Sequence, residues 1–273
     1  MRMIYKVVII LTLIFTILWF IPIYWMITGT LRPPGEMWVR TLFPSTLSLN
    51  TYIDIIFGRG KEFATFYRNS IVISIATTLI TLVLATPAAY GFSRFKFKGN
   101  TTFLLLVLLN QMFPKVLLSI PYFLMISELK MYNTLFAVIL MDVVYTLPFA
   151  LFMMKGWFDS IPPAIDESAL IDGCSRVGVI FRIMMPISKT MLFASGATCF
   201  LFTWNEYLFC RTFTSDPELR TVTIGIGEAI GQFYIDFPRL MASATLASIP
   251  VIIVFIVIQK YFIRGILSGA LKM

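Results

Sequence analysis

The chain has 273 residues, of which 58% are hydrophobic and only 13% are charged. Soluble domains are about 45–50% apolar, so the composition excludes an ordinary soluble domain and indicates a polytopic membrane protein. The net charge of +8 does not require a nucleic-acid partner, and none is expected, because Lys and Arg collect at the cytoplasmic ends of membrane helices. Histidine is absent, which removes the commonest metal ligand, and no metal site is expected.

Six apolar stretches follow one another along the chain, each close to the ~20 residues that a bilayer-spanning helix needs. They occupy residues 7–31, 69–93, 101–127, 131–154, 190–208 and 240–259. The first is longer than the apolar region of a signal peptide, so we expect it to be retained. Because a helix satisfies its own backbone hydrogen bonds in lipid, the predicted fold class is all-α: a transmembrane bundle of six spans that forms one domain over residues 1–273.

Basic residues near the ends of the spans predict the orientation of the chain. Arg94, Lys96 and Lys98 lie in a very short connection, and further basic residues flank the first and last spans. Such short basic connections stay in the cytoplasm. Both termini are therefore predicted to be cytoplasmic, in a plasma or inner membrane.

Three longer connections join the spans. With this orientation, residues 32–68 and 209–239 are external, and a short helix capped by Asn50 is expected in the first of them. Residues 155–189 form the single large internal loop. An internal loop of this size, set among apolar spans, suggests a surface that a cytosolic partner binds.

The internal loop carries the signals of two short helices joined by a tight turn. Pro162 and Pro163 suit a helix start, and Asp166 and Glu167 suit the positive end of its dipole. Gly173 suits a left-handed stop after that helix. A second helix is expected to follow at once.

Ser175 is expected to cap this second helix, and Pro186 marks its end. Apolar residues recur at helical spacing and predict one apolar stripe, formed by Val177, Ile180, Phe181 and Met184. From periodicity alone, two interpretations are equally open. The hairpin either anchors the loop at the membrane interface or transmits force from an ATPase that this chain does not contain.

The spacing within the loop resembles the EAA loop of ABC importer permeases. Glu167, Ala169, Gly173 and Pro186 stand at the positions of that motif, while Ser168 departs from its second residue. Further landmarks, at residues 30–33, 69–70, 88–90, 204–207 and 264–270, look like those of the carbohydrate-uptake permeases that are similar to the smaller permease of the maltose transporter. The resemblance covers nearly the whole chain.

The resemblance implies a type I ABC importer permease fold and a set of partners. These are a second homologous permease, two ATP-binding cassette subunits and an extracellular or periplasmic solute-binding protein that delivers a sugar. ATP and Mg would be bound by the partner subunits, and no cofactor by this chain, which lacks a G-x-x-x-x-G-K-[ST] phosphate loop. No catalytic residue is expected.

By the same resemblance, three segments acquire roles. The expected ATPase-coupling residues are Asp166, Glu167, Ser168, Ala169, Asp172, Gly173, Arg176 and Pro186. The tail at residues 268–272 would reach towards the ATPases. The external stretch 221–231, with Gly225, Gly227 and Glu228, would probe the binding protein; the alternative is a flexible connector.

Polar side chains within the spans are candidates for a solute pathway, because such groups are costly in lipid and tend to line pathways. The candidates are Asn110, Gln111, Asp142, Tyr145 and Asn205. Asp142 is expected to face the bundle interior or the second permease. The alternative for each residue is hydrogen bonding between helices. Trp204, Asn205 and Glu206 form either an outer gate or an interfacial anchor.

Other functions are weaker predictions. Asp172-Gly173 with Arg176 is faintly similar to the core of metal-dependent phosphatidyl transferases, but the next acid is Glu206, too distant to complete a metal site. A non-catalytic scaffold fits the composition but would not require the loop spacing. The prediction is therefore the permease subunit of an ATP-driven sugar importer that works by alternating access, and the alternative within this class is an importer of a non-sugar solute.

Overall fold

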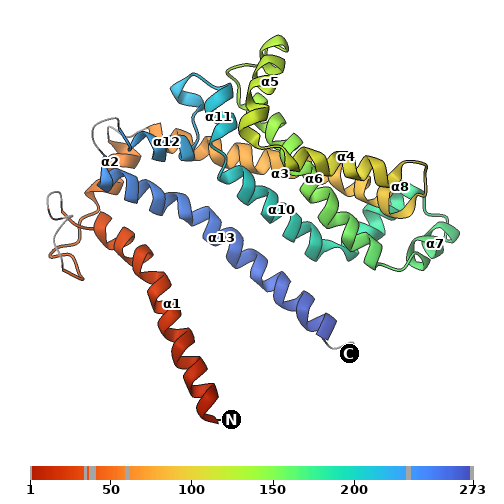
Figure 1. Ribbon diagram of the computed structural model, residues 1–273, viewed down its shortest axis with the longest axis horizontal. Coiled ribbons are helices and arrows are strands. Elements are labelled where there is room, and N and C mark those ends of the chain that lie inside the picture. The colour runs from red at the N-terminus through yellow and green to blue at the C-terminus, as the bar shows by residue number, and fades with distance from the viewer. Residues whose placement is uncertain (1, 34–35, 37–40, 59–61, 232–234, 271–273) are drawn as a thin grey trace. The chain divides into compact units, whose positions relative to one another are not determined.

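The computed structural model describes residues 2–33, 36, 41–58, 62–231 and 235–270, with side chains from residue 5 to residue 259 of these ranges. All the described elements are helical, which confirms the predicted all-α class. The longest are α1 (Arg2–Thr30), α3 (Glu62–Arg94), α6 (Leu135–Ser160) and α13 (Phe237–Ala270) (Figure 1). The others are α2 (Asn50–Phe57), α4 (Asn100–Met112), α5 (Lys115–Glu128), α7 (Ala164–Ile171), α8 (Arg176–Gly178), η1 (Val179–Met184), α9 (Met185–Ile187), α10 (Lys189–Trp204), α11 (Leu208–Phe213), η2 (Pro217–Leu219) and α12 (Val222–Glu228).

Four of the described helices are long and apolar enough to cross a membrane alone: Tyr5–Thr30, Glu62–Arg94, Leu135–Ser160 and Phe237–Gln259. Two pairs of helices reach this length only together and are bent. The bend is 102° between α4 and α5, and 84° between Arg176–Ile187 and α10. The six predicted spans are obtained if each bent pair is one crossing.

Proline chemistry explains the first bend. Phe113 and Pro114 separate α4 from α5, and both adopt extended backbone angles, with ψ of 127° and 129°. A residue that precedes a proline is pushed out of the helical region. Pro114 lacks an N–H that could continue the ladder of α4, so the apolar stretch 101–127 becomes two helices instead of one.

By the contacts between Cα atoms, the chain divides into two units, residues 1–64 with 225–249 and residues 65–224 with 250–273. In the first unit the hydroxyls of Thr30 and Tyr52 are hydrogen-bonded at 2.6 Å, which joins α1 to α2. Helix α2 begins at Asn50, but the capping position is Leu49, and no side chain caps it. The predicted cap by Asn50 is therefore wrong, because Asn50 is itself the first helical residue.

In the second unit, α3 and α6 run parallel, and their register changes by only one residue between two hydrogen-bonded pairs. The Thr81 and Thr146 hydroxyls are hydrogen-bonded at 2.8 Å, and the Ser93 hydroxyl donates to Asp159 at 2.6 Å. The two pairs have sequence separations of 65 and 66 residues. Between them, Ala85 and a residue 65 positions later, Ala150, share one buried cluster. Two membrane helices far apart in sequence are thus packed turn against turn.

Candidate functional site

The α7–α8 hairpin (residues 164–178) ends its first helix as the sequence predicts. Gly173 has φ of +84°, the left-handed conformation. The Cys174 N–H donates to Ala169 O at 3.0 Å and the Gly173 N–H donates to Leu170 O at 3.1 Å, which is the Schellman pattern. The Ser175 hydroxyl then accepts from the Gly178 N–H at 3.1 Å and caps α8. Both turn predictions are confirmed.

The apolar stripe predicted on the second helix is buried only in part within this chain. Val177 is 64% exposed and Phe181 is 55% exposed, whereas Met184 is fully buried. The cause is a π-helical segment, η1, that widens the turn over Val179–Met184. Wider turns bring residues five apart onto one face, so Val179 and Met184 are buried together. Spacing rules for an α-helix could not place them.

The hairpin exposes part of the predicted ATPase-coupling set and buries the rest. Glu167, Ser168, Asp172 and Gly173 are exposed around the turn, as are Arg176 and Pro186 in the next helical stretch. Asp166 and Ala169 are only 5% and 6% exposed. These two side chains lie on the inner face of α7, and Asp166 is paired with Arg94. The exposed turn is the surface available to a partner.

Sequence reasoning missed one prominent member of this surface. Ile171, the last residue of α7, is 86% exposed. An exposed apolar side chain beside the turn is available to a partner subunit. The signal in the sequence was its place directly before Asp172 and Gly173.

The two amides that are candidates for the solute pathway donate to a neighbouring helix, as in the alternative stated for them. Asn110 Nδ2 donates to Val144 O at 3.2 Å and Gln111 Nε2 donates to Tyr145 O at 2.5 Å. Val144 lies four residues before Pro148, which is inside α6 and has no N–H to offer. The Asn110 amide therefore supplies a donor to a carbonyl that would otherwise be unsatisfied in lipid.

Asp142 is buried within this chain. Its side chain belongs to α6 and the residue is 1% exposed, and its Oδ2 atom has no hydrogen-bond partner. Of the two positions expected for it, the bundle interior is correct for the isolated chain. Asn205, by contrast, is exposed, and its amide donates to Leu201 O of its own helix at 2.8 Å.

Next to Asp142 on α6, Tyr145 belongs to a charged cluster that the sequence did not predict. Lys115 pairs with Glu206, and its Nζ lies 3.7 Å from the centre of the Tyr145 ring and 5.0 Å from that of Phe209. Glu206 also accepts from the Phe209 N–H at 2.8 Å. We call these four residues the Lys115 cluster. The clue was a lysine directly after a proline in an apolar stretch.

The stretch proposed to probe a binding protein is helical over α12. Gly225 is buried, Gly227 is half-buried and Glu228 is exposed. Just before them, the Val222 N–H donates to the Ser70 hydroxyl at 2.9 Å and the Thr223 hydroxyl donates to Glu206 O at 2.6 Å. The beginning of the stretch is thus attached to α3, while residues 232–234 lie outside the described part.

Two remaining predictions, on the C-terminal tail and on a metal site, can be compared only with the residues that the structure describes. The C-terminal tail 268–272 is described only as backbone to Ala270, at the end of α13. Among the described side chains, no group of three or more His, Cys, Asp or Glu residues could hold a metal ion.

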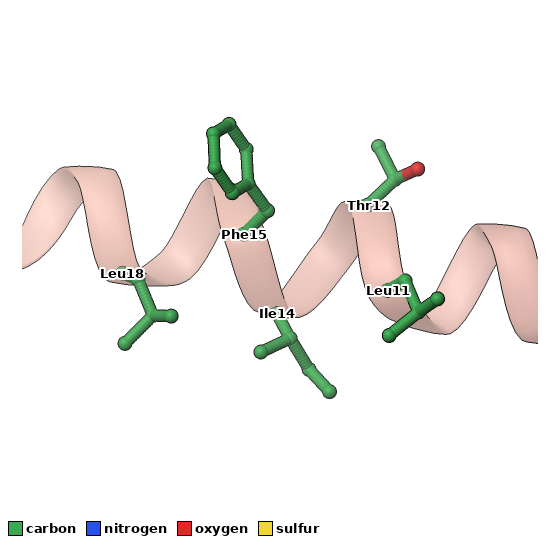
Figure 2. Close-up of a pocket in the computed structure, with 5 residues that line it drawn as sticks. All are labelled: Leu11, Thr12, Ile14, Phe15 and Leu18. Atoms are coloured by element: carbon green, nitrogen blue, oxygen red, sulfur yellow. The ribbon is translucent and has the colours of Figure 1, made fainter.

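A hollow on α1 offers little to a polar solute. Its lining comes from one helix, as Figure 2 shows: Leu11, Thr12, Ile14, Phe15 and Leu18. The single hydroxyl, on Thr12, is already bonded to Val8 O at 2.8 Å. Because sugars need several free donors and acceptors, this apolar face suits lipid or another helix.

A glycine turn fixed by backbone hydrogen bonds and left exposed among apolar helices agrees with a membrane transport subunit of the importer-permease class. The chain belongs to the family "Binding-protein-dependent transport system inner membrane component", whose model matches residues 55–268. It is therefore a multi-pass permease subunit of an ABC importer and not an enzyme. Membership implies ATPase subunits, a partner permease and a binding protein.

Named relatives align with almost the full length of the chain. The trehalose/maltose permease protein MalG of Thermococcus litoralis is 32% identical over 252 residues, 92% of this chain and 91% of the relative. The galactooligosaccharides permease protein GanQ of Bacillus subtilis is 32% identical over 256 residues, with coverages of 92% and 89%. The fold matches a crystal structure of a bacterial ABC transporter that imports the acidic polysaccharide alginate, with a TM-score of 0.83, 21% identity and coverages of 96% and 97%.

Proposed function

We propose that this permease imports a sugar, and that the α7–α8 hairpin is where an ATPase subunit drives it. The observation that carries the coupling assignment is the Gly173 turn, which is fixed by backbone hydrogen bonds yet leaves Glu167, Ser168 and Asp172 exposed. A rigid exposed turn can transmit a push, whereas a flexible loop would absorb it. Ile171, 86% exposed, adds an apolar contact to the same surface.

In the proposed mechanism, ATP binding, solute passage and solute delivery belong to different subunits. Two ATP-binding cassette subunits hold ATP and Mg, and their closure moves the hairpin of each permease. This chain and a second homologous permease enclose the solute between them and alternate between inward and outward access. A solute-binding protein delivers the sugar on the outer side, where residues 221–231 meet it. The whole chain works as one permease domain.

Support for a sugar comes from the named relatives. These relatives are named as permease proteins of transport systems for trehalose/maltose, galactooligosaccharides and arabinooligosaccharides. In this chain, the ring of Tyr145 and the charged groups of Lys115 and Glu206 lie together. Sugars bind to such combinations of an aromatic ring and hydrogen-bonding groups. A non-sugar solute is the competing outcome.

The coupling assignment is tested with Gly173→Leu in the complex purified with its partner subunits. A leucine at φ of +84° is strained, so we expect solute-stimulated ATP hydrolysis to be lost while membrane insertion is retained. The matched control is Gly156→Leu in α6, where an added Cβ meets nothing within 4 Å. Normal stimulation in the Gly173 variant would remove the assignment.

The solute is identified on the binding protein that is purified with the transporter. A panel of mono-, di- and oligosaccharides, together with polyamines, phosphate and peptides, is screened for binding by calorimetry and then for uptake into proteoliposomes. We expect a sugar to bind and to be taken up. Uptake of a member of the other classes alone would replace the sugar by that solute.

The orientation is tested through Cys174, which is half-buried in the hairpin, whereas Cys199 and Cys210 are buried. A membrane-impermeant maleimide should label Cys174 in inside-out vesicles and not in intact cells. Replacing Cys174 by Ser removes the signal and serves as the control. Labelling from outside only would place the hairpin on the wrong side of the membrane for an ATPase.

A further inference from the structure

Arg94, the last residue of α3, contacts three different points at the cytoplasmic end of the second unit. Its Nε pairs with Asp166 of α7. Its Nη1 donates to Phe158 O and its Nη2 donates to Ile161 O, both at 2.9 Å. Only 10% of the Arg94 side chain and 7% of the Asp166 side chain are exposed. We call these four residues the Arg94 network.

Elementary helix chemistry explains why an arginine stands here. The last carbonyls of a helix lack the usual donor four residues later. Phe158 lies in the last turn of α6, where its carbonyl accepts the capping Ile161 N–H at 3.1 Å, and Ile161 is the C-cap. Arginine presents a planar fork of donors that can reach several acceptors at once, whereas the lysine ammonium is a single point. One guanidinium can therefore hold the end of α6 and the beginning of α7 together.

The residues around this network form a packed block. The Ser93 hydroxyl donates to Asp159 of α6 at 2.6 Å, and the Tyr90 and Phe158 rings meet edge to face at 6.1 Å between their centres. One buried cluster collects side chains from all the elements concerned: Ala89 of α3, Met154 and Phe158 of α6, Ala169 of α7, and Val179 and Met184 of η1. Helix α7 is thus packed against the ends of α3 and α6 through one buried cluster.

We propose that Arg94 is a positioning residue that makes α7, α3 and α6 move as one body when an ATPase displaces the hairpin. This inference rests on the proposed coupling function. It adds the contact through which a displacement of the hairpin is transmitted to the membrane helices. Without the guanidinium, Asp166 keeps a buried carboxylate with no cation, and its Oδ1 already lacks a hydrogen-bond partner. The polar link between α7 and the end of α3 is then removed, while the exposed turn at Gly173 stays intact.

The test uses the transporter purified with its partner subunits through a tag on this chain. Hydrogen–deuterium exchange is measured with and without Mg and a non-hydrolysable ATP analogue, at α7 and at the cytoplasmic ends of α3 and α6. The variants are Arg94→Gln, which removes the charge, and Arg94→Lys, which keeps it. The matched control is Lys155→Gln, which breaks an ion pair of α6 whose Asp159 partner is 44% exposed.

In the unaltered chain and in Lys155→Gln, the nucleotide should change exchange in α7, α3 and α6 together. In Arg94→Gln the change should remain in α7 and be lost from α3. The same loss in Arg94→Lys shows that the fork, and not only the charge, is needed. If Arg94→Gln does not assemble, Arg94→Lys decides alone, because it keeps the charge that pairs with Asp166. An unchanged response of α3 in the variant that assembles overturns the proposal.

This experiment separates the failure of the inference from the failure of the proposed function. If the nucleotide leaves α7 unchanged in the unaltered complex, the hairpin is not the site of coupling, and the proposed function fails. If α7 responds and Arg94→Gln still passes the change to α3, the coupling function stands and only the role of Arg94 is removed.

Discussion

The turn between α7 and α8 is held by backbone hydrogen bonds and stays exposed, whereas the Lys115 cluster is held by side chains from different helices and is largely buried. The turn depends on the conformation of one residue, Gly173. The cluster depends on an ion pair removed from water, which needs its partners because a lone buried charge is costly. Exposed surfaces for a partner and buried contacts between helices are thus built from different interactions, and they should respond to substitution differently.

The largest effect is expected where one member of the buried pair is removed. Glu206→Ala leaves Lys115 without its counter-charge and the Phe209 N–H without its acceptor. Breaking a buried pair in this way costs about 3–5 kcal/mol. Thermal unfolding of the purified complex should show a clear loss of stability. An unchanged melting temperature would mean that the Lys115 cluster is not a structural link.

An intermediate effect is expected in the hairpin. Ser175→Ala removes the cap of α8, and the loss of such a cap costs about 1 kcal/mol. The change should appear as faster amide exchange at Gly178, with little change in the melting temperature. Ser175→Asp, which keeps a capping oxygen, is the control. Equal exchange in the alanine variant would contradict the role of the cap.

A smaller effect is expected where Asn110 contacts α6. Hydrogen bonds between membrane helices contribute on average about 0.6 kcal/mol, so Asn110→Ala should lower stability only slightly. With Pro148→Ala the backbone regains an N–H for Val144 O, and the effect of Asn110→Ala should then shrink. A double-mutant cycle measures this coupling, and strict additivity would refute it.

The smallest effect is expected at the exposed ion pair. Lys155 and Asp159 are one helical turn apart, with side chains 22% and 44% exposed. Pairs of this kind contribute about 0.3–0.5 kcal/mol. Lys155→Gln should therefore leave the melting temperature and ATP hydrolysis nearly unchanged. A large loss would mean that a partner subunit buries this pair.

Local signals predicted the hairpin well. The left-handed turn at Gly173 and the cap at Ser175 are set by neighbours in sequence, so a short window sufficed. The buried face of the next helix was missed because η1 departs from the α-helical period. The all-α fold could be predicted because each apolar stretch is continuous in the sequence. The family could be predicted because the residues of the loop motif lie close together in the sequence.

Contacts between distant helices could not be predicted in the same way. Lys115 and Glu206 are 91 residues apart, and Arg94 and Asp166 are 72 apart. Only the packing of the helices brings these groups together. Asn110 and Gln111 were predicted either to line a pathway or to bond between helices, and nothing in their own neighbourhood pointed to the carbonyls near Pro148.

The register between α3 and α6 restricts how this transporter half can change shape. Thr81 faces Thr146 and Ser93 faces Asp159 along a shared stripe. Successive side chains of a helix point about 100° apart, because a helix has 3.6 residues per turn, so sliding one helix along the other would separate the Thr81–Thr146 and Ser93–Asp159 pairs. Sliding by several ångströms along the helix axes is therefore disfavoured, and α3 and α6 are suited to tilting together as one rigid body.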